Sequence, residues 1–328
     1  MKRGTIIITC ALAALAAGAV AEEVSVEDLL RRAEKTYREM DALEVTGEAV
    51  MEMEGGLSFD MRHSFTARLK RPNHYCIAWT TQMPFMGGPA RGQVRFAVWN
   101  AGDGPYLYFG LLGTYSPMKR DDMAIAAATG ISGGAAQQVP ALFFPETGLG
   151  RSPIRLKDAQ LAGTEKLGDQ ECYVVKGHDM PGEQSTLWIS AARHVLLKKV
   201  IRWDLQDIED SQPMTDEEID EFLEETGQEV TPERRAQVRR TVDDAGDMMK
   251  EAQGTLTQTV RYATVKVNPE LAVEDLRYKL PEGARLDENP FGGLMNQIDE
   301  LAASEETEAD AESESDAEPE SDQQSADE

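Results

Sequence analysis

One short segment of the chain matches a catalytic pattern. Residues Gly130 to Gly134 read GISGG, the glycine-x-serine-x-glycine spacing of a nucleophile elbow, in which Ser132 would attack an ester carbonyl. That motif needs a strand before the serine and a helix after it. Here Asp121 to Ala128 has a helical pattern, and we expect a glycine-rich loop to follow. We therefore expect no catalytic residue and interpret the segment as part of a lid; a hydrolase acting through Ser132 is the third of three hypotheses.

The histidines and cysteines do not form a metal-binding pattern. Cys76 and Cys172 are the cysteines outside the N-terminal apolar run, and both fall in the middle of expected strands. Two alternatives stay open for them, a disulfide or two buried thiols. We expect neither a metal nor a cofactor. The four histidines fall on separate strands or loops without metal-ligand spacing, at His63, His74, His178 and His194.

The residues best suited to hold a ligand are apolar. Many of them are methionines, whose unbranched side chains adapt to an alkyl chain of variable shape. Each could equally be an ordinary core residue, and both interpretations stay open. The candidate cavity lining consists of Met51, Met53, Phe59, Met61, Phe65, Trp79, Met83, Phe85, Met86, Met118, Met123 and Phe143.

The chain begins with the pattern of a secretory signal peptide. Lys2 and Arg3 precede an apolar run from Ile6 to Leu15, and Ala19-Val20-Ala21 has the small residues of a cleavage site. We expect residues 1–21 to be removed and the mature protein to be soluble and exported. No other run approaches the roughly 20 apolar residues that a membrane span requires.

The formal net charge of −26 is concentrated in two segments. Asp204 to Gln253 holds 17 acidic and 5 basic residues, and Leu286 to Glu328 holds 16 acidic and no basic ones. The rest of the mature chain is neutral in total. Because a nucleic-acid partner would need a concentrated basic face, we expect no nucleic-acid binding.

Alternating apolar and polar residues predict that most of the chain forms strands. In the run from Leu256 the alternation slips by one residue around Ala263–Thr264, which predicts a β-bulge, and Asn268–Pro269 ends the strand. Successive strands have the spacing of hairpins, so we expect one curved antiparallel sheet. Its strands are expected at 43–54, 57–69, 75–81, 94–99, 106–109, 160–166, 171–176, 185–190, 195–203 and 256–267, with a further short run at 276–280.

Helical periodicity predicts one helix before the sheet and two within the acidic segment. Glu22 to Asp41 opens with Ser25 as its cap, and Thr215 with Glu218 and Thr231–Pro232 mark the starts of the other two. Apart from a short helix expected within Phe291 to Leu301, the tail buries nothing and should be disordered. The expected divisions are a signal peptide at 1–21, a sheet domain at 22–286 with an acidic helical insert at 204–253, and an acidic tail at 287–328.

Three segments in order resemble the LolA-like family of periplasmic lipoprotein carriers. Lys70-Arg71-Pro72-Asn73 closes a long strand as the family's Lys-Arg-Pro-Asn segment does. Asp103-Gly104 followed by Tyr106-Leu107-Tyr108 is similar to the family's turn and aromatic strand, and Asn268 to Arg285 resembles its closing Asn-Pro and Pro-x-Gly segment. The acidic insert and the tail depart from the family pattern.

The resemblance implies a mainly β fold with helices, an unclosed, strongly curved antiparallel half-barrel capped by helices around an apolar cavity. It implies a periplasmic, non-enzymatic carrier that shields lipoprotein acyl chains or another lipid and delivers them towards the outer membrane. An inner-membrane exporter and an outer-membrane acceptor would be its partners, and we expect a monomer. By the same resemblance Arg71 is a lid latch, whose guanidinium donates to carbonyls within Gly110 to Glu146 and holds the empty cavity shut.

A second hypothesis uses the same fold in a different class of protein. An RseB-like periplasmic sensor or scaffold would bind a partner protein through the acidic insert. Insert-dependent capture of a protein would favour this second hypothesis, and co-purified lipid would favour the carrier.

Overall fold

One curved sheet organises the molecule. The computed structural model describes residues 24–55, 59–82, 93–132, 134–145, 152–179, 182–206, 214–225, 229–251 and 254–288. The expected signal peptide, the apolar loop at 83–92, the short helix expected within 291–301 and the acidic tail lie outside these residues. No helix in the described part of the chain is both long and apolar enough to cross a bilayer.

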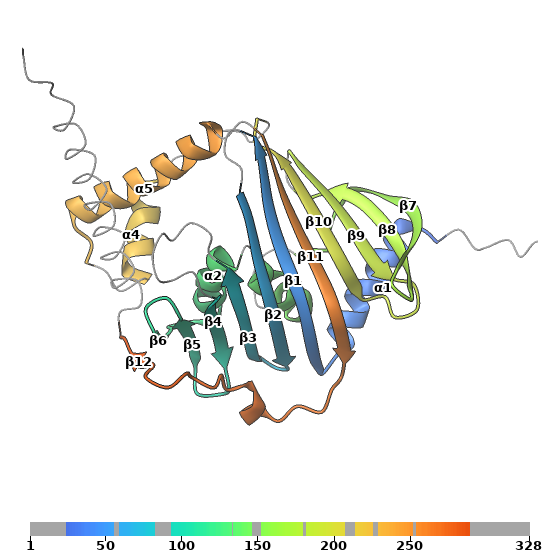
Figure 1. The fold of residues 1–328 in the computed structure, drawn as a ribbon, viewed down its shortest axis with the longest axis horizontal. Coiled ribbons are helices and arrows are strands. Elements are labelled where there is room, and N and C mark those ends of the chain that lie inside the picture. Colours follow the sequence, from blue (N-terminus) through green and yellow to red (C-terminus); the bar gives the residue numbers. More distant parts are fainter. Residues whose placement is uncertain are drawn as a thin grey trace, which may run out of the picture.

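The sheet has twelve strands in the order β12-β6-β5-β4-β3-β2-β1-β11-β10-β9-β8-β7 (Figure 1). Its two end strands, β12 and β7, do not pair with each other, so the sheet is unclosed. All neighbours are antiparallel except β12 and β6, which run parallel. The predicted fold class is therefore confirmed. The strands are β1 (Ala42–Gly55), β2 (Phe59–Lys70), β3 (His74–Gln82), β4 (Gln93–Asn100), β5 (Pro105–Phe109), β6 (Thr114–Pro117), β7 (Lys157–Leu167), β8 (Gln170–His178), β9 (Glu183–Ser190), β10 (Leu196–Asp204), β11 (Gly254–Val267) and β12 (Arg285–Leu286).

The predicted bulge is present in β11. Thr46 pairs with Thr264, but the next residue, Gly47, pairs with Tyr262, so Ala263 is the extra residue. Gly47 has no room for a side chain, because a Cβ there would lie 2.3 Å from the Arg261 carbonyl oxygen. The bulge bends the central strand pair and adds to the curvature of the sheet.

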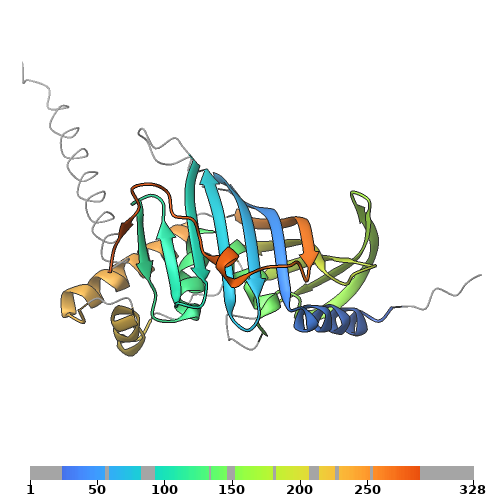
Figure 2. The ribbon, with the colours of Figure 1, turned by 90° about the horizontal axis from the view of Figure 1, so that it is seen from below.

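Three helices lie against the concave face of the sheet (Figures 1 and 2). Helix α1 (Val26–Glu39) begins as predicted, with the Ser25 side chain accepting from the Asp28 amide. Helices α2 (Asp121–Ile131) and α3 (Ala135–Phe143) follow β6 and contact β4, β5 and β2. Because these two helices cover the apolar face, we call them the lid helices.

The chain after β11 corrects one expectation. The run at 276–280 was expected to be a strand, but Val273–Leu276 forms a 3₁₀ helix and the following residues form no strand. Tyr278 packs its ring 5.6 Å from both Trp99 and Tyr108 on the convex face. Stacking on aromatic rings, not strand pairing, therefore holds this segment to the sheet.

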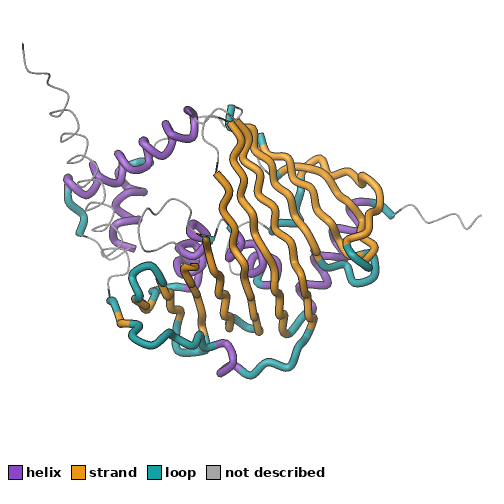
Figure 3. The backbone as a smooth tube through the Cα atoms, viewed as in Figure 1, coloured by secondary structure: helices purple, strands orange, loops and turns teal. Residues whose placement is uncertain are grey.

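The segment between β10 and β11 forms two helices, as predicted. These are α4 (Asp216–Glu225) and α5 (Pro232–Glu251), which project beyond the sheet (Figures 1 and 3). Ile219 and Leu223 of α4 pack on Val238 of α5 in a hydrophobic cluster of their own. The insert thus has a small separate core.

Candidate functional site

The concave face of the sheet carries five of the twelve predicted cavity residues, Met51, Met53, Met61, Phe65 and Trp79. Gln138 of α3 donates to Oε1 of Gln258 on β11 at 2.9 Å, which identifies the face that the lid covers. Gln258 lies opposite Met51, and Met51 lies opposite Met61. Since residues directly opposite on antiparallel strands share a face, both methionines point to the side of the lid helices.

The lid begins at the lower rim of the sheet, as oriented in Figure 1, where an acidic residue anchors it. Asp121, the first residue of α2, accepts from Tyr75 Oη at 2.9 Å and from Asn100 Nδ2 at 2.9 Å. Burial, together with the charge of Asp121, raises the pKa of Tyr75, so its hydroxyl stays protonated and donates. Asp121 was not predicted as a site residue, although an acidic residue in the first turn of a helix is a usable signal.

Arg71 holds the other end of the lid at the same rim. Its Nη2 donates to the Phe143 carbonyl at 2.6 Å, and the guanidinium lies 4.8 Å from the centre of the Phe143 ring. Its Nε and Nη2 also donate to the carbonyls of Met40 at 3.0 Å and Tyr37 at 3.4 Å. Arg71 therefore connects the ends of α1 and α3 to the end of β2.

Between these anchors the lid turns back near the middle of the sheet. Trp79 Nε1 donates to the Ile131 carbonyl at the end of α2, at 3.2 Å. At Gly134, which has a φ of +81°, a Cβ would lie 2.9 Å from Gln258 Nε2. The turn is thus seated closely on β3 and β11, and the upper part of the concave face lies beyond it.

Five of the predicted lining residues lie in the packed core under the lid. Trp79 stacks on Phe96 with 5.5 Å between ring centres, and the lid residue Phe143 is fully buried. Met123 of α2 is partly buried against the same cluster. These residues belong to one packed hydrophobic cluster instead of lining an open space. The five are Phe65, Trp79, Met118, Met123 and Phe143.

The upper part of the concave face carries a second set, which we call the methionine patch: Met51, Met53 and Met61. Met51 and Met61 are partly exposed, whereas Met53 is buried against Leu205 and Leu256 in a small separate cluster. Phe59 belongs to β2, and its side chain lies outside the described part. Met83, Phe85 and Met86 lie in the loop outside the described residues.

A buried histidine lies two residues after Met61 on β2, on the same face as this patch. His63 is 1% exposed, and its Nδ1 is 2.8 Å from Thr81 Oγ1, while its Nε2 is enclosed without a hydrogen-bond partner. Burial lowers the pKa of His63 to about 4, so the ring is neutral near pH 7. Neutral imidazole fits an apolar surrounding better than its charged form would.

The glutamines that join α3 to β11 were also missed from the sequence. Gln138 accepts from Tyr262 Oη at 3.5 Å in addition to its bond with Gln258. Gln258 occupies an inward position of β11, two residues before Val260, and a polar residue at such a position was the available signal.

Ser132 has a structural role in the lid. A helix does follow it, so the expected glycine-rich loop is wrong: only Ser132 to Gly134 separates α2 from α3. The Ser132 side chain is buried, donates to the Thr129 carbonyl at 3.3 Å and accepts from the Ala136 amide at 2.9 Å. Its hydroxyl therefore satisfies one amide in the first turn of α3. A helix also precedes it, where a nucleophile elbow would need a strand.

The two cysteines are free thiols in different clusters. Cys172 belongs to the main core, whereas Cys76 lies on the convex face with Trp99 and Leu276. Burial raises the pKa of Cys76 to about 11. Of the two alternatives for these cysteines, the structure has the buried thiols.

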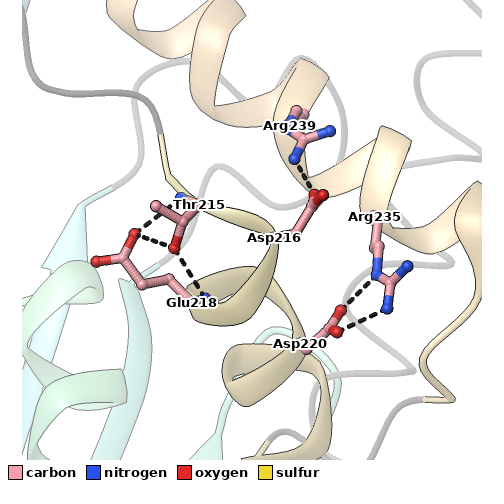
Figure 4. Close-up of polar contacts among 6 residues, drawn as sticks. All are labelled: Thr215, Asp216, Glu218, Asp220, Arg235 and Arg239. Carbon is pink, nitrogen blue, oxygen red and sulfur yellow. Dashed lines mark hydrogen bonds and ion pairs between the residues drawn. The ribbon is translucent and has the colours of Figure 1, made fainter.

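The insert is held by ion pairs as well as by its own core. Arg235 binds Asp220 through two hydrogen bonds of 2.5 and 2.6 Å, and Arg239 pairs with Asp216 (Figure 4). Glu218 and Thr215 form the predicted capping box. Lys119 Nζ donates to the Glu224 carbonyl at 2.8 Å and links α4 to the segment before α2.

The comparisons with known proteins give matches among solved structures alone. No protein-family model matches the chain. No curated protein matches it either.

A LolA superfamily protein from Nitrosomonas europaea is 10% identical, with a TM-score of 0.27 over 78% of this chain and 98% of that one. A putative outer membrane lipoprotein-sorting protein domain from Vibrio parahaemolyticus is 10% identical, with a TM-score of 0.29 over 77% of this chain and 97% of that one. A chain of the MucA/MucB complex of Pseudomonas aeruginosa is 11% identical, with a TM-score of 0.33 over 78% of this chain and 62% of that one. The matched structures thus include LolA-superfamily proteins, the family that the sequence resembles.

Proposed function

We propose that this protein is a periplasmic, non-catalytic carrier that shields acyl chains of a lipoprotein or another lipid. The observation that supports it best is the division of the concave face. Its lower part is closed by a lid held through a few polar contacts, and its upper part presents Met51 and Met61 partly exposed. An alkyl chain that entered at the methionine patch would reach the aromatic residues under the lid if the lid moved.

Arg71 is the proposed latch of that lid. Its guanidinium bonds to the Phe143 carbonyl and lies against the Phe143 ring. A hydrogen bond from a charged donor contributes about 1.5–3 kcal/mol, enough to change the population of a closed lid tenfold or more. Such a latch would make an empty cavity close and would favour release of the cargo.

The acidic insert supports a second candidate function, a sensor or scaffold that binds a protein partner. The insert has its own core and ion pairs and touches the body through Lys119 and Glu224, as a separate binding module would. Phe222 of α4 is 42% exposed. In this candidate the sheet would bind a lipid signal and the insert would bind the partner.

Native mass spectrometry of the protein purified from its own envelope tests the first proposal. We expect a co-purified lipid, and we expect the purified protein to bind a fluorescent fatty acid. A protein that carries no lipid and does not bind the probe would contradict the carrier function.

A deletion of residues 207–253, with a short linker from Gln206 to Gly254, separates the two candidates. The ends of this segment are close, because the Leu205 amide donates to the Gly254 carbonyl at 2.9 Å. A carrier should bind the fatty acid about as tightly after the deletion. Loss of an envelope protein from pull-downs, with lipid binding intact, would favour the scaffold.

A further inference from the structure

A lysine lies on the concave face among apolar residues. Lys199 of β10 is opposite Val260 of β11, and Val260 lies two residues after Gln258 on the face that contacts the lid. The Lys199 side chain therefore points to the same side as the methionine patch, and its residue is only 4% exposed. Lysine is almost never this buried without a partner.

The ammonium of Lys199 has no direct partner. Among the described residues, no hydrogen bond or ion pair involves its side chain. Three described side-chain nitrogens are fully enclosed without a partner: His63 Nε2, His74 Nδ1 and Trp99 Nε1. Lys199 Nζ is not one of them, so this nitrogen keeps some contact with solvent. Three N–H donors are thus available at an opening in an apolar face.

Two acidic side chains act on Lys199 from a distance. Glu183 and Asp179 favour the charged form, while burial favours the neutral form and lowers the pKa of Lys199 below its usual value. Glu183 accepts from Ser185 Oγ at 2.5 Å. Leu187 of β9 is opposite Lys199. Glu183 lies four residues before Leu187, so roughly 13 Å of strand separates these two backbone positions. The acidic groups therefore offset the charge without occupying the lysine's donors.

We propose that Lys199 binds the acidic head group, a carboxylate or a phosphate, of an amphipathic lipid whose alkyl chain lies on the methionine patch. This inference rests on the proposed carrier function and specifies its ligand. Lys199 lies two residues before Ile201 on β10, and Ile201 lies opposite Gln258 in the row of Met51 and Met61. The Lys199 ammonium therefore lies near the methionine patch, just as the acidic head group of an amphipathic lipid lies next to its alkyl chain. An ammonium buried without a direct partner is costly to a fold, and a bound anion removes that cost.

The test compares acidic probes with uncharged probes of the same chain. Oleate and methyl oleate form one pair, and dodecyl phosphate and dodecanol form the other, all measured at neutral pH on the full mature chain. We expect the wild type to bind at least one acidic probe about tenfold more tightly than its uncharged partner. The pair that shows the preference identifies the carboxylate or the phosphate as the group bound.

The decisive variant is Lys199→Met, which keeps the length of the side chain and removes its charge. We expect it to lose the preference while binding methyl oleate as the wild type does, and Lys199→Arg should keep most of the preference. Lys198→Met is the matched control, because Lys198 lies on the opposite face with its Nζ 4.2 Å from the Trp188 ring centre. This control should keep the full preference.

The outcomes distinguish the two proposals. Failure of the wild type to bind any of the four probes would contradict the carrier function itself. Equal binding of acidic and uncharged probes by the wild type would leave the carrier function intact and overturn the role of Lys199. An equal loss of affinity for methyl oleate and oleate in Lys199→Met, with unchanged preference, would assign Lys199 a structural role instead.

Discussion

The concave face of the sheet is densely packed in its lower part and more open to solvent in its upper part. In the lower part, Phe96 is fully buried between Trp79 and Phe109, with ring centres 5.5 and 5.1 Å away. In the upper part, Met51 and Met61 are partly exposed. The lid helices contribute to this difference, because they pack on the lower part and are bonded to the sheet through the Ile131 carbonyl at Trp79 and through Gln138 at Gln258.

We expect this difference in packing to give the lower part a role in stability and the upper part a role in binding. Stacked, fully buried aromatic rings contribute strongly to the free energy of folding but leave no space for a ligand. Flexible thioether side chains at a partly open face contribute less to folding and can repack around a guest. We therefore expect substitutions in the lower part to change stability and substitutions in the upper part to change binding.

The largest effect is expected for Phe96→Ala. Removing a fully buried phenylalanine leaves a cavity and costs about 3–5 kcal/mol of unfolding free energy. Chemical denaturation monitored by circular dichroism measures this loss. Val267→Ala, at a position that is 40% exposed, is the control and should change the unfolding free energy by less than about 0.5 kcal/mol. A loss below about 1 kcal/mol for Phe96→Ala would mean that the lower part is loosely packed.

The next largest effect is expected for pH at His63, which lies between the two parts. The folded pKa of about 4 lies below the ordinary value of 6.5, so the unfolded chain binds the proton more readily. The contribution of His63 to stability is therefore complete above pH 6.5 and is lost as the pH falls through about 4. The loss should amount to about 3 kcal/mol.

Unfolding free energies of the wild type and His63→Gln, measured from neutral pH to pH 4, test this expectation. The variant should lose less stability over this range than the wild type, because glutamine does not titrate. The wild type measured over the same pH range is the reference for the variant. Parallel curves for the wild type and His63→Gln would show that His63 is protonated without cost.

The fold followed from the sequence wherever periodicity carried the signal. The ten longer strands, the Ser25 and Thr215 caps and the bulge at Ala263 all depend on local patterns, and the structure has each of them, whereas the short run at 276–280 is not a strand. The missed elements were short or lacked such a pattern. The four residues of β6 are too few to show alternation, and α3 begins at a glycine in the left-handed region, where no usual cap exists.

The site was harder to predict because its polar residues act across long sequence separations. Asp121 meets Tyr75, and Gln138 meets Gln258, only after the lid has folded onto the sheet. In the sequence, Lys199 looks like a residue of an ordinary amphipathic strand. Only the strand register shows that it lies on the covered face of the sheet. A methionine-rich composition indicated an apolar face but could not divide it into a packed and an open part.

A binding effect of about tenfold or more is expected for Arg71→Leu. The variant lacks the hydrogen bond to the Phe143 carbonyl, so the closed empty state competes less with the loaded one, and lipid should bind more tightly and leave more slowly. Arg68→Leu is the control, because Arg68 pairs with Glu44, a residue that alternates with the inward positions of β1. Unchanged affinity and release rate in a folded Arg71→Leu protein would remove the latch from the proposed mechanism.

The smallest effect on stability is expected for Met61→Ala in the methionine patch. Met61 is partly exposed and already in contact with solvent, so its truncation should reduce the unfolding free energy by less than about 1 kcal/mol. The same change removes part of the surface on which an alkyl chain would lie, so the affinity for a fluorescent fatty acid should fall several-fold. Denaturation and probe titration of the same preparation measure both quantities. A stability loss as large as that of Phe96→Ala, with unchanged affinity, would show that the upper part is core like the lower part.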